Sequence, residues 1–422
     1  MATATSAQTY DIIERRNSWN AGTNVTGIMM DSVTTSYAEL YGNNRHGDFR
    51  NSYEAEKSWS AGAVAKSITH LKGYSLTGSF SFDHTSGKNM SGSMFIHPGF
   101  YPVDLLEFTP GRKNLQTYAF MGGIATDITP NWRLGGKVDF VASNYSKRKD
   151  LRHTNYRLDL TVAPSVMYHS GELAIGFSYI FNKNSESVKA EVIGTAETSY
   201  NAFLDKGLMY GAYEAWNGSG IHLSESGING FPIKELSHGA ALQLQWKGFY
   251  GEFGYTHSSG SAGEREAIWF KFPTHRIASR LSYRFKQGNK EHFLRLNLQW
   301  SHLANNENVI SKETVNGITT THVHGSNRIF EKDAFFANPE YELLSPCGEF
   351  RAGSELAVFK SLATQMYPYI ASEKMLCSRT YISGVLHTGR FDLKAAVSFS
   401  TGSFTEKSRT AGTSTEPGDP PY

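Results

Sequence analysis

The main pattern along this chain is a strict alternation of apolar and polar residues over long stretches. Between residues 73 and 84, even positions are apolar or glycine, and odd positions after Gly73 are serine, threonine or aspartate. Because successive side chains of a strand point to opposite faces, such a stretch has one apolar and one polar face. Stretches of this length exceed most soluble strands and suit a strand that crosses a membrane at a tilt.

The same alternation recurs along most of the chain. From residue 154, Tyr156, Leu158 and Leu160 alternate with Arg157 and Asp159. Several apolar faces end in aromatic residues, as at a bilayer interface, and the opposite faces are polar at mid-strand, as in a wet lumen. We therefore expect an all-β fold: a transmembrane antiparallel β-barrel of about 14–16 strands with long extracellular loops. The alternative is a secreted all-β protein whose strands have one solvated face.

Connections between the alternating stretches differ in length. Short turns are expected around Pro130, Gly171 and Gly288. Long connections are expected at residues 95–114, 183–237 and 303–353. Barrels of this kind keep short turns on the periplasmic side and long loops outside, which predicts that the long connections lie on the cell surface.

The barrel strands are expected within residues 32–404. Residues 1–31 do not alternate, and their start resembles the end of a signal peptide, so we expect a signal-peptide remnant and a non-strand segment, periplasmic or inside the barrel. The last convincing alternation ends near Gly402. Residues 405–422 are polar and rich in proline, which predicts a loop before a missing closing strand.

Composition agrees with a barrel and excludes other classes. Charged residues make up 19% and aromatic residues 13%, with a mean hydropathy of −0.40, whereas soluble domains carry about 25% charge. The net charge of +2 gives no reason to expect nucleic acid as a partner. Cys347 and Cys377 are too few for a disulfide framework and leave one bridge or two free thiols open. The expected location is the bacterial outer membrane, with lipid and lipopolysaccharide as partners.

Five segments also resemble a known family. They are IIERRNSWNAGTNVTGI (12–28), KNMSGSMFIHPGFYPVDLLEF (88–108), GRKNLQTYAFMGGI (111–124), GGKVDFVASNYSKRKDLRHTN (135–155) and SHGAALQLQW (237–246). Together they resemble a Bacteroidota family of outer-membrane β-barrels of unknown function. The resemblance implies a fold and a location, but no activity. Members of that family begin with a cleaved signal and end on a strand.

Basic residues on the polar faces are the first candidates for function. Arg276, Arg280 and Arg284 recur every four residues, and Arg295 follows. Such a ladder would favour anions in a pore. Alternatively, the arginines pair with Asp139, Asp159 and Glu252 and brace the barrel. The lumen-facing candidates are Arg276, Arg280, Arg284, Arg295, Arg157, Asp159, Lys137 and Asp139.

Other candidates lie in the expected loops. An extracellular binding surface could use the loop aromatics Tyr200, Tyr210, Tyr213 and Trp216. The basic run at residues 147–153 could bind lipopolysaccharide or anchor the barrel as a solvated turn. His322 and His324 could begin a metal site, but further ligands are lacking nearby, so exposed loop histidines are expected and no metal.

No catalytic motif emerges. The sequence has no evident nucleophile elbow or metalloprotease helix, so we expect neither an enzyme nor a cofactor. The expected function is a transport or ligand-capture component of the envelope, with surface lipoproteins or a transport complex as candidate partners. The alternative is a non-transporting scaffold that anchors a surface lipoprotein or partner complex. A continuous water path through the lumen would distinguish the two.

Overall fold

The computed structural model describes most of the chain. The described residues are 10, 13–48, 50–51, 53–191, 202–207, 213–216, 228–264, 267–316, 318–366, 369–388 and 391–410. They form one antiparallel sheet of seventeen strands. The strands are β1 (Thr35–His46), β2 (Lys57–Leu71), β3 (Tyr74–Ser93), β4 (Asp104–Thr129), β5 (Trp132–Lys147), β6 (Arg152–Ser170), β7 (Leu173–Glu191), β8 (Ala202–Asp205), β9 (Tyr213–Trp216), β10 (Ile228–Trp246), β11 (Phe249–Glu264), β12 (Ala267–Gln287), β13 (Lys290–Val315), β14 (Ile318–Ser345), β15 (Gly348–Met366), β16 (Tyr369–His387) and β17 (Asp392–Thr410).

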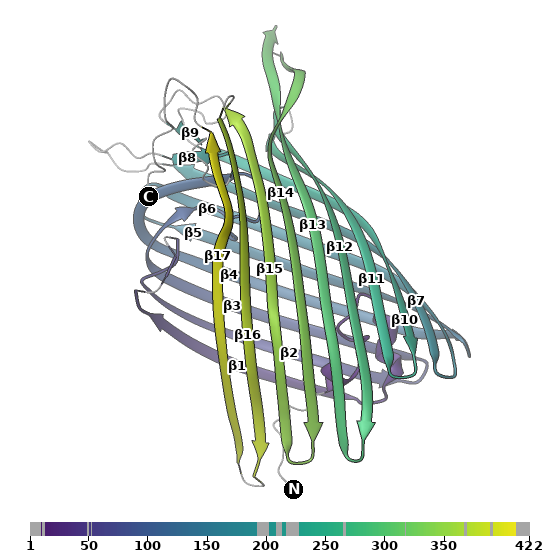
Figure 1. Cartoon of the computed structure of the whole chain (residues 1–422). Coiled ribbons are helices and arrows are strands. Elements are labelled where there is room, and N and C mark those ends of the chain that lie inside the picture. The colour runs from purple at the N-terminus through teal and green to yellow at the C-terminus, as the bar shows by residue number, and fades with distance from the viewer. Residues whose placement is uncertain are drawn as a thin grey trace.

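The sheet curves into a barrel wall (Figure 1). Consecutive strands pair from β1 to β7, β7 pairs with β10, and consecutive strands pair again to β17. β8 and β9 form a small hairpin attached to β4, which leaves fifteen strands in the wall. This agrees with the expected fold class. β1 and β17 are the edge strands, and no register joins them among the described residues. None of the helices described is long and apolar enough to cross a membrane.

The alternation of the sequence sorts the side chains onto the two faces of the wall. On β5 and β6, Trp132 lies opposite Tyr168, and Val138 lies opposite Val162, on the outside. Trp132 is 46% exposed, whereas Ser165 and Met167, one position out of phase, are buried. The wall is therefore apolar outside between aromatic ends, as in a barrel that spans a membrane.

The two ends of the barrel differ. At the lower end in Figure 1, strands are joined by short turns, among them those at residues 130–131, 171–172 and 288–289. Gly171 and Gly288 have positive φ angles of 58° and 57°, which two-residue hairpins require and glycine allows. The turns expected at these positions are confirmed.

The prediction of a long loop at residues 303–353 is wrong. These residues belong to β13, β14 and the start of β15, and the β13–β14 hairpin rises above the rest of the wall (Figure 1). Its outer part is held by polar cross-strand contacts, such as Ser311 Oγ to His324 Nε2 at 2.7 Å. That part of the hairpin lies beyond the apolar exterior of the wall. It therefore needs no apolar face, and the alternation expected of a membrane strand is absent there. His322 and His324 lie in β14 and are exposed.

The other two long connections are also shorter than expected, because the strands extend further. β4 begins at Asp104, β7 continues to Glu191 and β10 begins at Ile228.

The last strand likewise extends further than expected. β17 continues to Thr410, so residues 405–410 pair with β16 rather than forming a loop. Ion pairs link the two strands there, from Lys374 to Glu406 at 3.3 Å and from Lys407 to Glu373 at 3.5 Å. These charged pairs sustain the end of the strand, where the apolar stripe has stopped. Residues 411–422 lie outside the described residues.

At the long-connection end, apolar side chains fill the inner side of the wall. The connection between β3 and β4 turns inward and buries Phe95 and Tyr101 against strand residues such as Phe272. The same cluster includes Phe231 and Phe330, from β10 and β14. This packing gives the upper lumen a hydrophobic core.

Candidate functional site in the lumen

The N-terminal segment, residues 13–30, lies inside the barrel at the short-turn end. It contains a helical turn at residues 13–16 and the 3-10 helix η1 (Val25–Met30). Its side chains contact strands around the wall from β2 to β15. It is the purple ribbon within the barrel in Figure 1.

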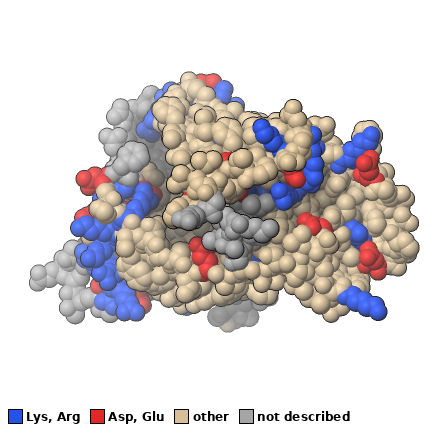
Figure 2. Space-filling view, turned by 90° about the horizontal axis from the view of Figure 1, so that it is seen from below, with Lys and Arg blue, Asp and Glu red and all other residues tan. Residues whose placement is uncertain are grey.

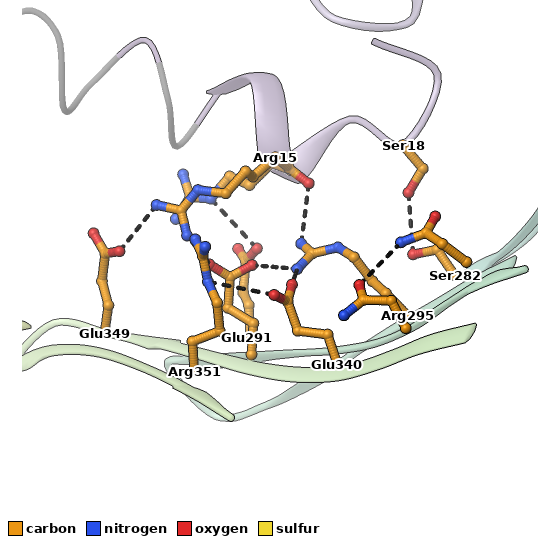
Figure 3. Close-up of polar contacts among 12 residues, drawn as sticks. Arg15, Ser18, Ser282, Glu291, Arg295, Glu340, Glu349 and Arg351 are labelled. Atoms are coloured by element: carbon orange, nitrogen blue, oxygen red, sulfur yellow. Dashed lines mark hydrogen bonds and ion pairs between the residues drawn. The ribbon is translucent and has the colours of Figure 1, made fainter. Parts of the chain in front are cut away.

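An ion-pair cluster anchors the start of the segment (Figure 3). Arg15 pairs with Glu342 of β14 and, at 3.0 Å, with Glu349 of β15. Arg295 pairs with Glu342 at 2.6 Å and donates to the backbone carbonyl of Arg15 at 3.2 Å. Arg351 also reaches Glu342, at 3.4 Å. Because Glu342 is fully buried, its charge is costly unless such partners surround it.

Seen from below, basic and acidic side chains lie beside one another in the centre and on the right of Figure 2, and a group of mostly basic side chains lies at its left edge. Two further pairs extend the cluster, from Arg295 to Glu340 at 3.0 Å and from Arg284 to Glu291 at 3.0 Å. Charges of opposite sign therefore offset one another where the segment meets the wall.

Trp19 anchors the middle of the segment. Its side chain is 2% exposed, and its ring packs edge-on against Tyr250 at 5.2 Å between centroids. The indole N–H donates to Gln245 Oε1. A Cβ at Gly27 would lie only 2.1 Å from Trp19 Cβ, so the turn closes over the ring because residue 27 has no side chain.

Glu252 of β11 holds the next part of the segment. Its carboxylate accepts from Thr23 N at 3.0 Å and Thr23 Oγ1 at 3.2 Å. From the wall it accepts from Gln243 Nε2 at 3.1 Å and Tyr250 Oη at 3.2 Å. Arg280 Nη1 lies 3.8 Å away. This inward carboxylate is therefore largely satisfied by hydrogen bonds between the segment and the wall.

Asn24 then caps η1. Its Oδ1 accepts from Thr26 N at 3.0 Å, and its Nδ2 donates to the Val166 carbonyl at 3.0 Å. A side chain that is 1% exposed thus has partners for both polar atoms. Beyond it, Val25 packs over Gly135, where a Cβ would lie 2.8 Å from Val25 Cγ1. Small residues of the wall thus accommodate the helix.

Tyr10 adds a contact on the opposite wall. Its ring packs against Tyr37 at 5.2 Å between centroids, and Lys66 lies 5.5 Å from its ring centre. Burial, with a smaller contribution from the charge of Glu14, raises the pKa of Tyr10 to about 12. The phenol is therefore neutral at physiological pH.

A cavity of about 890 Å³ lies beside the segment, along β12 to β17. Its polar lining includes Arg280, Asn297, Glu355 and Arg379, and Ala21 of the segment also lines it. Arg379 lies 3.7 Å from Glu355, and both side chains are about half exposed. Among the described residues, the ion pairs of these two arginines are long, so Arg280 and Arg379 can bind an anionic group without breaking a short ion pair. We call this cavity the lumen chamber.

The lumen-facing candidates separate into two groups. Arg276, Arg280 and Arg284 share the face of β12 that carries Ser282, whose hydroxyl contacts Ser18 of the segment at 3.1 Å. Arg280, Arg284 and Arg295 take part in the contacts above. No ion pair involves Arg276 within the part of the chain that the structure describes.

The remaining candidates pair with one another on β5 and β6. Arg157 pairs with Asp159 at 2.8 Å, and Lys137 lies 3.4 Å from Asp139. If the arginines brace the barrel, the β12 arginines are expected to pair with Asp139, Asp159 and Glu252. Of these three carboxylates, only Glu252 lies beside a β12 arginine.

The loop candidates contribute less to the site. Tyr200 and Tyr210 lie outside the described residues, and Tyr213 and Trp216 are the ends of β9, which pairs with β8. Among the described residues, no three histidine, cysteine or acidic side chains gather as metal ligands. Sequence reasoning missed Arg15, Trp19 and Asn24, although the segment that holds them was among those carrying the resemblance.

A model of a family of unknown function, DUF6850, matches residues 26–406. No curated protein matches the chain. Solved structures with a similar fold include the copper transporter OprC, at 8% identity and a TM-score of 0.36, covering 86% of this chain and 69% of that one. Another is Pseudomonas aeruginosa FpvA bound to heterologous pyoverdines, at 8% identity and 0.38, covering 88% and 61%. A third is the siderophore receptor PiuA from Acinetobacter baumannii, at 9% and 0.38, covering 86% and 72%.

Proposed function

We propose that this chain, which belongs to the DUF6850 family of unknown function, is an outer-membrane transport or ligand-capture barrel gated by its N-terminal segment. The observation that carries the proposal is the lumen chamber, one side of which is formed by Ala21 of that segment. A chamber beside a segment held mostly by polar contacts can change its access when those contacts break. Its exposed Arg280 and Arg379 favour solutes with anionic groups.

A second candidate function is the non-transporting scaffold. It is favoured by the hydrophobic core of the upper lumen, where Phe95, Tyr101 and Phe272 pack together. A barrel filled at both ends could serve as a rigid support for a surface partner. We also propose a Bacteroidota source, on the resemblance described above. As partners we propose lipopolysaccharide and a surface lipoprotein or transport complex.

Ionic conductance in a planar bilayer tests the gate. We expect the full chain to show little steady conductance, because the segment is anchored across the lumen. Replacing both anchors, in Arg15→Ala with Trp19→Ala, removes the ion pairs to Glu342 and Glu349 and the buried ring. We expect this variant to conduct in long openings, since fewer contacts then hold the segment against the wall.

The matched control is Arg16→Ala. Arg16 neighbours Arg15 but is 45% exposed and lies 3.6 Å from Glu291, so its loss should leave conductance at the level of the unaltered chain. All variants must keep a heat-modifiable band on a semi-native gel, which reports a folded barrel. A folded double variant that stays closed contradicts the gated barrel and supports the scaffold.

A further inference from the structure

Four histidines form a row across the outside of the wall. His238, His257, His275 and His302 lie on β10 to β13, and each is directly opposite the next. These four strands are neighbours in the wall (Figure 1). The histidines share the outward faces that carry Leu242, Leu244 and the exterior aromatics. The row therefore faces the surroundings of the barrel rather than its lumen.

The row lies at the upper edge of the apolar exterior. On β10, the outward residues from Trp246 to Leu236 are apolar except for His238. That span is about the length of a membrane-crossing strand. Below the row are Tyr179, Tyr255 and Trp300, in the position of an interface girdle.

Tyrosines of the girdle orient two of the imidazoles, those of His238 and His275. Tyr179 Oη lies 2.6 Å from His238 Nδ1, and Tyr255 Oη lies 2.8 Å from His275 Nδ1. When a tyrosine hydroxyl donates to Nδ1, the ring proton remains on Nε2, which is then a donor. At the end of the row, His302 Nδ1 pairs with Asp333 at 2.9 Å. His238 and His275 can therefore present N–H donors at the membrane edge.

A cationic row follows towards the long-connection end. Lys234 lies opposite Ser261, which lies opposite Lys271. This row is four residues beyond the histidines, or roughly 13 Å along the strands. Lys234 and Lys271 are exposed, and neither forms an ion pair in the described part of the chain. Towards this end the exterior thus passes from aromatic rings to imidazoles and then to ammonium groups.

We propose that the outward face of β10 to β12 binds the phosphate groups of a phosphorylated glycolipid in the leaflet at the long-connection end. The acyl chains would lie on the apolar band, the headgroup would meet the Nε2 donors, and the phosphates would pair with Lys234 and Lys271. Charge complementarity favours this occupant, because phosphate oxygens accept hydrogen bonds from both kinds of group. The inference rests on the exterior alone and is independent of any activity of the lumen.

Native mass spectrometry of the full chain, with lipid A or dephosphorylated lipid A added to detergent, tests the proposal. We expect retention of lipid A only. Lys234→Gln with Lys271→Gln should weaken retention on the order of tenfold or more, because each lysine near an anionic headgroup contributes to binding. His257→Gln with His275→Gln should weaken it less, because neutral donors are lost rather than charges.

The matched control is His292→Gln, at the opposite edge of the band. His292 stacks on Phe285 at 4.6 Å between centroids and contacts Tyr341 Oη at 2.9 Å, yet it faces the other leaflet. The His292→Gln variant should retain lipid A as well as the unaltered chain does. The proposal would be overturned if dephosphorylated lipid A were retained as well as lipid A, or if inorganic phosphate competed as well as lipid A does. A dimer mass in place of the lipid-bound mass would also overturn it. A heat-modifiable band shows that each variant is folded.

Discussion

Two buried glutamates show how this barrel accommodates internal charge. Glu342 is surrounded by Arg15, Arg295 and Arg351. Glu107, also fully buried, lies between the ammonium groups of Lys113 and Lys147. Removing one partner from a buried pair typically costs about 3–5 kcal/mol. Such clusters therefore hold together the elements that they join. The cluster around Glu342 holds the N-terminal segment against the wall.

The exterior follows a simpler rule, and it leads to a prediction at the residue scale. Val162 lies midway along the outward face of β6, between Tyr156 and Tyr168. Val162→Arg should lower the free energy of unfolding by about 2–4 kcal/mol, because the charge enters the middle of the hydrocarbon. Tyr156→Arg, at the edge, should cost about 0–1 kcal/mol. Urea unfolding in lipid vesicles measures both, and equal costs would contradict the assigned band.

At this scale, the sequence predicted which way residues face but not what they touch. The period of two placed Tyr156 outside and Arg157 on the other face of β6. It could not assign partners to Arg284 of β12 or Arg295 of β13, because strand pairing alone brings Glu291, Glu340 and Glu342 beside them.

Among the elements, those outside the apolar band were the hardest to predict. The β13–β14 hairpin and the end of β17 carry polar side chains on both faces, so the expected alternation does not mark them. The N-terminal segment has no strand period, and its position depends on single contacts such as Trp19 with Tyr250. Strands that cross the band were predictable because lipid demands an apolar face at every second residue.

The tall hairpin gives a prediction for the orientation of the barrel. Lys312 is exposed near the tip of β13, and Lys290 lies at the other end of the same strand. A lysine-specific protease added to whole cells should cleave at Lys312 and spare Lys290, because the long-connection end should face outward. Cleavage at both sites in lysed cells would show that Lys290 is accessible from the periplasm. Whole-cell cleavage at Lys290 alone would reverse the orientation.

For the whole molecule, the question is whether the N-terminal segment moves during function. Transport through the lumen requires it to move, whereas a scaffold requires it to stay. Ser18 of the segment and Ser282 of β12 have hydroxyl oxygens 3.1 Å apart, so cysteines there are close enough to be linked. Replacing Cys347 and Cys377 with serine would leave that pair as the only thiols.

In that background, Ser18→Cys with Ser282→Cys should form a disulfide under mild oxidation and tie the segment to the wall. If the gate opens by releasing the segment, the linked barrel should stay closed even when Arg15 and Trp19 are replaced by alanine. Reduction should then restore the conductance of that double variant, and Ser18→Cys alone should not respond to oxidant. A linked barrel that conducts as freely as the reduced one would mean that ions pass without displacing the segment, and the gating role proposed for it would be wrong.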